Sequence, residues 1–182
     1  TDDQIDFKTG GSDRVTINAS GNVGIGTTTI NNNGLGTATY FGNSTSALTG
    51  DNTSGNSRFW LSNNWYYNSG DKYIITDEAT IYTQQNGEHQ FLTAPSGSAD
   101  SAISFSVGLK IDNAGHVTKP LQPAVLVTKS TSQLNIAVNA NTTHTFDSEV
   151  FDVGGDFASN TFTAPVTGKY LVCLQIMWQN IP

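Results

Sequence analysis

Six aromatic residues between positions 59 and 73 form the group of side chains best suited to binding a ligand. They are Phe59, Trp60, Trp65, Tyr66, Tyr67 and Tyr73. Flat aromatic faces with nearby asparagines suit stacking on sugar rings, so Trp60, Trp65 and Tyr67 are the candidate contacts with a glycan or receptor surface. A second interpretation follows from the alternation of side chains along a strand. In that case Phe59 and Leu61 point one way, Trp60 points the other, and part of the group fills a core.

Four acidic residues are candidates for acid–base chemistry only because they lie near these aromatics. They are Asp71, Asp77, Glu78 and Glu88. Glycoside hydrolysis needs two carboxyl groups ~5–9.5 Å apart, but acidic residues in turns are more often simply solvated. The sequence has no G-x-S-x-G nucleophile motif. We therefore predict no catalytic residue and no enzymatic activity.

Metal and phosphate sites are equally unsupported. The glycines of Gly21–Gly26 do not follow the G-x-G-x-x-G spacing, and Thr27–Ile30 is a poor helix start. The segment Asp51–Gly55 has too few acidic ligands for a calcium loop. The three histidines, His89, His116 and His144, are far apart. We predict no metal and no cofactor, with one alternative: a metal held by a single histidine from each of several copies.

The composition points to β-structure. Charged residues make up 13% of the 182 residues, where about 25% is usual, and the chain is rich in Gly, Thr, Ser and Asn, as β-structure with many turns is. Strong helix formers are scarce, which excludes a helical bundle. With eight Lys and Arg and a net charge of −7, the chain is not expected to bind nucleic acid. It has no apolar run long enough for membrane insertion, and because it begins with Thr1 we expect it to be a fragment or a processed product.

One sequence pattern occurs twice. Ile17–Val23 reappears as Ile111–Val117, each with an apolar residue, a polar Asx turn, a glycine and a second apolar residue. This order predicts strand, tight turn and strand, with Gly21 and Gly115 at positions that need a positive φ. Ile17 and Val23 then share one face, which Ile25 continues.

Further strands are expected on both sides of a boundary marked by prolines. The candidates before it are 58–61, 65–67, 73–76 and 80–83, with a hairpin at Asn86-Gly87. The range 31–55 is expected to be a loop, a linker or a fibre-like segment. Pro120 and Pro123 mark the boundary. After it, a half-buried sheet is predicted from the alternating Val125, Val127, Leu134, Ile136 and Val138. The apolar run Tyr170–Trp178 predicts a central strand in which Cys173 is buried.

Three stretches resemble known families. Arg14–Thr28, with the sequence RVTINASGNVGIGTT, resembles the R-x-x-I-x-x-x-G-N-V-G-I-G-T-T repeat of bacteriophage tail fibres and related virion adhesins. Residues 82–105 resemble a module found between such repeats. Glu149–Asp152 and Thr161–Tyr170 resemble the N-terminal half of the trimeric jelly roll shared by complement globular heads and tumour necrosis factor. In the second copy of the repeat, His116 and Thr118 replace Asn and Gly, which suggests that the shaft ends there.

The resemblance implies an all-β, trimeric fibre of β-hairpin modules with an incomplete C-terminal jelly-roll β-sandwich. Residues 1–48 would be a shaft repeat and linker, 49–119 a compact β-module ending in a second shaft repeat, and 120–182 the start of the jelly roll. The candidate trimer core consists of Ile17, Val23, Ile25, Ile111 and Val117. The candidate turn or close-packing glycines are Gly21, Gly24, Gly26 and Gly115, of which Gly24 and Gly26 would let backbones approach near a threefold axis.

The expected role is that of a structural tail-fibre component in the virion, outside the cell. It would present a trimeric tip to a host receptor, with a surface glycan as the expected target, and would contact other virion tail proteins. Two alternatives remain at this point: a bacterial surface adhesin with the same repeats, and a polysaccharide-degrading tailspike.

Overall fold

The computed structural model describes residues 3–30, 37–42, 45–51, 58–137 and 139–177, and these residues form an all-β structure. Within them no helix is long and apolar enough to cross a membrane. The chain divides into two compact units, Thr1–Leu121 and Gln122–Pro182. The N-terminal unit is built on one large sheet, whereas the C-terminal unit contains two short hairpins.

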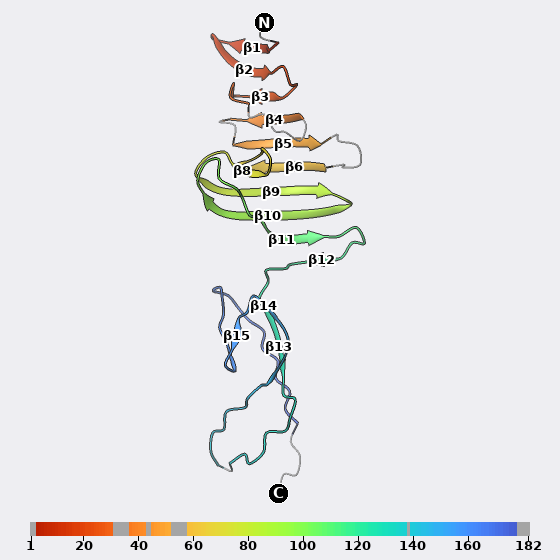
Figure 1. Cartoon of the computed structure of the whole chain (residues 1–182), viewed down its shortest axis with the longest axis vertical. Helices are drawn as coiled ribbons and strands as arrows, with labels where there is room; N and C mark the ends of the chain where they lie inside the picture. Colours follow the sequence, from red (N-terminus) through yellow and green to blue (C-terminus); the bar gives the residue numbers. More distant parts are fainter. Residues whose placement is uncertain (1–2, 31–36, 43–44, 52–57, 138, 178–182) are drawn as a thin grey trace. The chain divides into compact units, whose positions relative to one another are not determined.

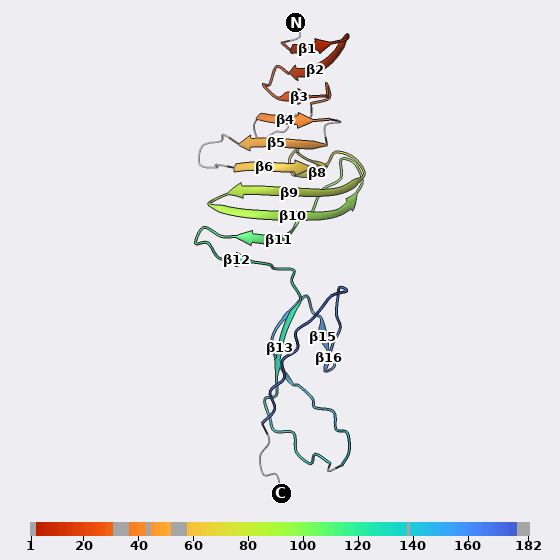
Figure 2. The same cartoon turned by 180° about the vertical axis from the view of Figure 1, so that it is seen from behind.

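The large sheet has ten strands, and its strand order nearly follows the order of the chain (Figure 1). The strands are β1 (Ile5–Thr9), β2 (Ser12–Ile17), β3 (Val23–Ile25), β4 (Thr37–Phe41), β5 (Ser46–Asp51), β6 (Arg58–Asn63), β9 (Asp77–Gln85), β10 (Glu88–Gly97), β11 (Ser106–Ile111) and β12 (Val117–Thr118). Neighbours are antiparallel except β3 and β4, which are parallel. The reverse view in Figure 2 shows the same succession of strands from the other side.

Tight turns with positive φ values join several of these strands. The β9–β10 turn uses Asn86 and Gly87 at φ 54° and 75°, as the Asn-Gly signal predicts for a two-residue hairpin. The β1–β2 turn uses Gly10 and Gly11 at φ 58° and 77° in the same way. These turns set the register between neighbouring strands, which decides which side chains share a face.

One face of the sheet is buried by the chain itself over its middle strands, β4 to β6, β9 and β10. A hairpin of β7 (Trp65–Tyr67) and β8 (Asp71–Tyr73) follows β6, and its Trp65 and Tyr73 join Trp60 and Ile81 of the sheet in a core cluster. The buried Asn64 holds this hairpin in place: its amide oxygen accepts from Ile74 N and Ile75 N at 3.1 and 2.8 Å. Its amide nitrogen donates to Glu78 O at 2.9 Å.

The predicted segmentation of the N-terminal region needs correction. The segment 31–55, expected to be a loop, a linker or a fibre-like segment, contains β4 and β5, which excludes a plain loop or linker. The expected boundary between residues 48 and 49 falls inside β5, so the first two predicted segments belong to one sheet. Strands form here although the segment has few apolar residues, because Tyr40 of β4 and the small Ala47 of β5 pack tightly on the buried face of the paired strands. The second strand of the side hairpin is 71–73 rather than the expected 73–76.

The C-terminal unit consists of two separate hairpins. β13 (Ala124–Thr128) pairs with β14 (Ser148–Val153), and β15 (Phe157–Ala158) pairs with β16 (Thr161–Phe162). Asp147, just before β14, accepts from Ser130 N at 2.6 Å and from Lys129 Nζ at 3.1 Å. The Ser130 N–H and the Lys129 ammonium lower the pKa of Asp147 to about 2.

The expected central strand of this unit is not formed in the described residues. Residues 170–177 lie outside any strand; Leu171 is 91% exposed and Cys173 is exposed, so the prediction of a buried Cys173 is wrong. Leu134 and Ile136 are also outside strands, while Val138 and Trp178 lie outside the described residues. An apolar segment forms a stable strand only against neighbouring strands. No described segment pairs with residues 170–177 or with the segment that contains Leu134 and Ile136.

Candidate functional site

The face of the large sheet opposite the core is open and nearly free of charge. Register partners across the ten strands place its side chains in three rows, which together we call the open face. The first row is Ile5, Ile17, Val23, Thr39, Leu48, Leu61, Tyr82, Phe91 and Leu109; the second is Phe7, Val15, Ile25, Phe41, Ser46, Asn63, Thr80, Thr93 and Ser106; the third is Thr37, Gly50, Phe59, Gln84, His89, Ile111 and Val117.

The first row of the open face is apolar along most of its length, whereas the second row is apolar only from Phe7 to Phe41 and polar from Ser46 to Ser106. None of its residues is buried, and Phe7, Leu61 and Phe91 are 59%, 50% and 47% exposed. No Asp, Glu, Lys or Arg occupies any of the three rows. Soluble monomers rarely expose a continuous apolar surface of this extent, and such surfaces mark sites of protein association.

All five sequence-predicted core positions lie on the open face. Ile17 and Val23 are in its first row, Ile25 in the second, and Ile111 and Val117 in the third. Several of their apolar neighbours on this face were not predicted from the sequence, among them Phe7, Phe41 and Phe91. Strict alternation within each strand was the signal that would have found them.

The two copies of the repeated motif form the same turn. In the first copy, Asn18 N donates to Asn22 O at 3.0 Å, and Gly21 N donates to Asn18 O at 2.8 Å. In the second, Asp112 N donates to His116 O and Gly115 N to Asp112 O, both at 3.0 Å.

The first side chain of each turn also accepts two backbone N–H groups. Asn18 Oδ1 accepts from Ser20 N and Asn22 N at 3.1 and 3.0 Å. Asp112 Oδ1 accepts from Ala114 N and His116 N, both at 2.9 Å. The repeat therefore encodes one local structure at both places.

The glycines of the motif have different roles from one another. Gly21 and Gly115 have φ values of 79° and 86°, as the turn prediction requires. Gly26 also has a positive φ, 71°, and donates its N–H to Arg14 O at 2.9 Å. Gly24 lies on the face opposite Val23 and Ile25, where a Cβ would overlap the carbonyl oxygen of Thr27 and crowd Ile30. The close approach at Gly24 is thus to residues of its own chain.

Two of the three candidate glycan contacts are buried. Trp60 and Trp65 are 6% and 2% exposed, and their rings pack 5.7 Å apart, centroid to centroid. The Trp65 indole N–H also donates to Asp71 Oδ1 at 2.8 Å. The expectation that these two tryptophans are exposed is wrong, because the β7–β8 hairpin folds them into the core. Tyr67 is half-buried against the same cluster.

Three of the four acidic residues near the aromatics have structural partners, and the fourth, Glu78, is exposed. Asp71 holds the Trp65 indole, Asp77 Oδ1 accepts from Glu78 N at 3.0 Å, and Glu88 forms an ion pair with Lys110 at 2.6 Å. The Lys110 ammonium lowers the pKa of Glu88. Among the described residues, no three His, Cys, Asp or Glu side chains gather as metal ligands would.

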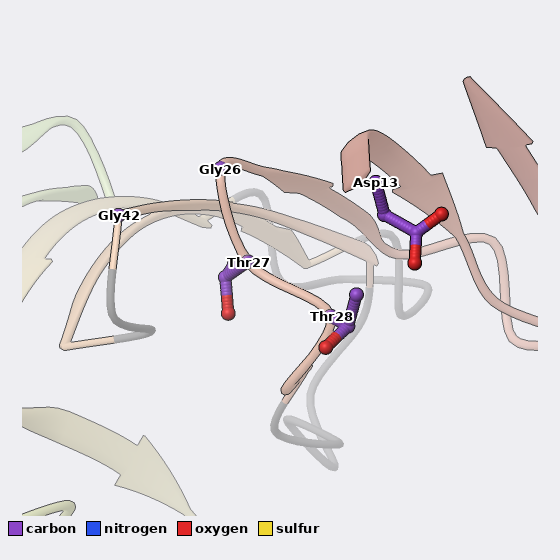
Figure 3. Close-up of a pocket in the computed structure, with 5 residues that line it drawn as sticks. All are labelled: Asp13, Gly26, Thr27, Thr28 and Gly42. Atoms are coloured by element: carbon purple, nitrogen blue, oxygen red, sulfur yellow. The ribbon is translucent and has the colours of Figure 1, made fainter. Parts of the chain in front are cut away.

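A hollow of about 440 Å³ lies beside the end of β3, lined by Asp13, Gly26, Thr27, Thr28 and Gly42 (Figure 3). Its one carboxylate, Asp13, already forms an ion pair with Lys8 at 2.6 Å. This pairing neutralises the charge that a cation would need, and the hollow has no second charged group. It therefore has little capacity to hold an ion.

Comparison with protein families, curated proteins and solved structures gives no significant match. The open face is thus the functional feature that the geometry itself defines.

Proposed function

We propose that this chain is a structural component of a trimeric phage tail fibre that mediates attachment to the host cell. Its place is the virion exterior, where it joins other tail proteins to a receptor-binding tip. The observation that supports this proposal is the open face, whose first row is largely apolar and whose three rows hold no Asp, Glu, Lys or Arg across the ten strands of the sheet. Three copies that turn this face toward a common axis would remove it from water.

The other features of the chain agree with a structural role. The carboxylates near the aromatic cluster are held by the indole, backbone and lysine partners described above. The repeated turn supplies the same local structure at two levels of one sheet, as a shaft built of repeats requires. Attachment through three copies also suits weak surface receptors such as glycans, because avidity multiplies individual contacts.

Sedimentation of the full 182-residue chain tests the proposal. We expect a single trimeric species. Leu61→Asp and Phe91→Asp, each about half exposed in one chain, should give folded monomers, since three negative charges would meet in a desolvated interface. Ser96→Asp, at an exposed position outside the open face, is the matched control and should remain trimeric. A monomeric wild-type chain, or trimers that persist in both open-face variants, would contradict the proposal.

Incubation of the chain with host polysaccharides separates the structural role from the tailspike alternative. We expect retention on a glycan surface without release of oligosaccharides. Release of oligosaccharides would favour a degrading tailspike.

A further inference from the structure

A hollow of about 270 Å³ in the C-terminal unit is lined by residues from the start of β14 and from the β15–β16 hairpin. Pockets for drug-sized ligands begin at about 300 Å³, so this hollow has room only for a small molecule. Its lining includes the apolar Val127, Phe146 and Phe157 and the polar Glu149 and Asn160. The two phenylalanines are half-buried, which leaves part of each ring accessible to a ligand.

Hydrogen bonds at two points hold the β15–β16 hairpin beside β14. Asn160, in the turn of the hairpin, accepts the N–H of Phe146 on Oδ1 at 2.7 Å. At the other end, the Asp152 carboxylate of β14 accepts from Asp156 N and Phe157 N at 3.0 and 2.9 Å. The walls of the hollow are therefore positioned by contacts within the chain itself.

The fixed charge around the hollow is negative. Its described lining contains two carboxylates, Asp147 and Glu149, and no lysine or arginine. The Asp147 carboxylate already has a cationic partner, Lys129 Nζ at 3.1 Å. The Glu149 carboxylate has no ion pair or hydrogen bond with any described residue. Val127 and Glu149 are register partners on β13 and β14, so this carboxylate projects from the same face of the hairpin as the apolar Val127.

This combination of groups favours one class of ligand. An anion would be repelled by the unpaired carboxylate of Glu149. A purely apolar molecule would remove that carboxylate from water without compensating its charge. A cation that carries apolar groups is attracted both by the carboxylate and by the negative faces of aromatic rings. The net charge of −7 also draws cations toward the chain.

We propose that this hollow binds a small organic cation, an ammonium group with apolar substituents, between Glu149 and the rings of Phe146 and Phe157. Glu149 supplies the opposite charge, and the two rings with Val127 contact the apolar substituents. The site is complete within one chain, so it depends neither on self-association nor on the proposed place of the chain in a virion.

Ligand-observed NMR with the full 182-residue chain tests the proposal. The probes are choline and its uncharged carbon isostere, neohexyl alcohol, which have nearly the same shape and differ in charge. We expect choline to bind roughly fivefold more tightly, which is the effect of an exposed ion pair. At about 1 M salt the difference should nearly vanish, because the Debye length falls to about 3 Å.

Variants of the lining locate the site. Glu149→Gln, at an exposed position, removes the charge and should weaken choline binding to the level of neohexyl alcohol. Phe146→Leu keeps an apolar side chain but removes an aromatic face, so it should weaken the binding of choline more than that of neohexyl alcohol. Glu78→Gln, an exposed carboxylate of the N-terminal unit, is the matched control and should bind choline as the wild type does.

Three results would overturn the proposal. The first is wild-type chain that binds choline no more tightly than neohexyl alcohol, or does not bind choline. The second is a Glu149→Gln variant that binds choline as tightly as the wild type. The third is binding of a neutral hexose in competition with choline at equal or higher affinity, which would make the hollow a sugar site.

Discussion

The two copies of the repeated turn differ in what lies beyond them. After the first turn, β3 pairs in parallel with β4, and the buried Asn22 accepts the N–H of Ala38 at 2.8 Å. After the second turn, β12 is the last strand of the sheet. His116, which takes the place of Asn22, directs its imidazole back to Asp112 Oδ2 at 3.0 Å. The turn itself is therefore a local unit, and the residue before its second strand contacts a further strand in the first copy but not in the second.

The largest expected effect comes from Asn22→Ala. The substitution leaves the buried Ala38 N–H without its acceptor and opens a small cavity, so we expect a loss of about 3 kcal/mol in the free energy of unfolding. Urea denaturation measures it. The matched variant His116→Ala, at an exposed position, should change stability by no more than about 0.5 kcal/mol. Equal losses of unfolding free energy at positions 22 and 116 would contradict the different roles assigned to Asn22 and His116.

A somewhat smaller effect is expected at Gly24. Gly24→Ala places a Cβ against the Thr27 carbonyl and should cost about 2 kcal/mol in urea denaturation, because backbone must move to admit it. Thr118 occupies the corresponding place in the second copy and already has a side chain. Thr118→Ala should therefore be close to neutral. A neutral Gly24→Ala would show that the close approach to Thr27 is unimportant.

The two turn glycines should behave alike. Gly21→Ala and Gly115→Ala each force an L-residue into the left-handed region, at φ values of 79° and 86°. We expect about 1 kcal/mol of destabilisation from each by the same measurement. A large difference between the two losses in unfolding free energy would mean that the two turns, despite the same hydrogen bonds, differ in backbone strain.

The smallest effect is one of pH, and it should appear in only one turn. The backbone N–H of His116, with the His116 side chain and the Ala114 N–H, lowers the pKa of Asp112 from its usual 3.8. The stability that Asp112 contributes is thus present above about pH 4 and lost as the pH falls through its lowered pKa in the fold. The amide resonances of Ala114 and His116 should shift on acidification, while those of Ser20 and Asn22 should not, because Asn18 has no titrating group. Asp112→Asn should abolish the shift.

Local signals in the sequence predicted the turns and the apolar positions well. The Asx–Gly pattern located both turns, and alternation placed Ile17, Val23 and Ile25 on one face. The all-β class followed from composition. These features depend on residues that are close together in the sequence, so they can be predicted from a single sequence.

Features that depend on distant segments were not predictable in this way. The burial of Trp60 depends on a hairpin that folds back from residues 65–73, and β4 pairs with β3 across residues of low apolar content. The apolar run after Tyr170 satisfies every local criterion for a strand, yet residues 170–177 find no neighbouring strand in the described chain. Strand formation there depends on partners that periodicity cannot specify.

The near-sequential strand order has a consequence for how the N-terminal unit folds. Apart from the β7–β8 hairpin between β6 and β9, each strand of the large sheet pairs with the strand that comes before it in the chain. Loop-closure entropy is therefore small at almost every step, and pairing can advance from the N-terminus as the polypeptide leaves the ribosome. The one delayed step is the β6–β9 pairing, which must wait for the residues between them to fold.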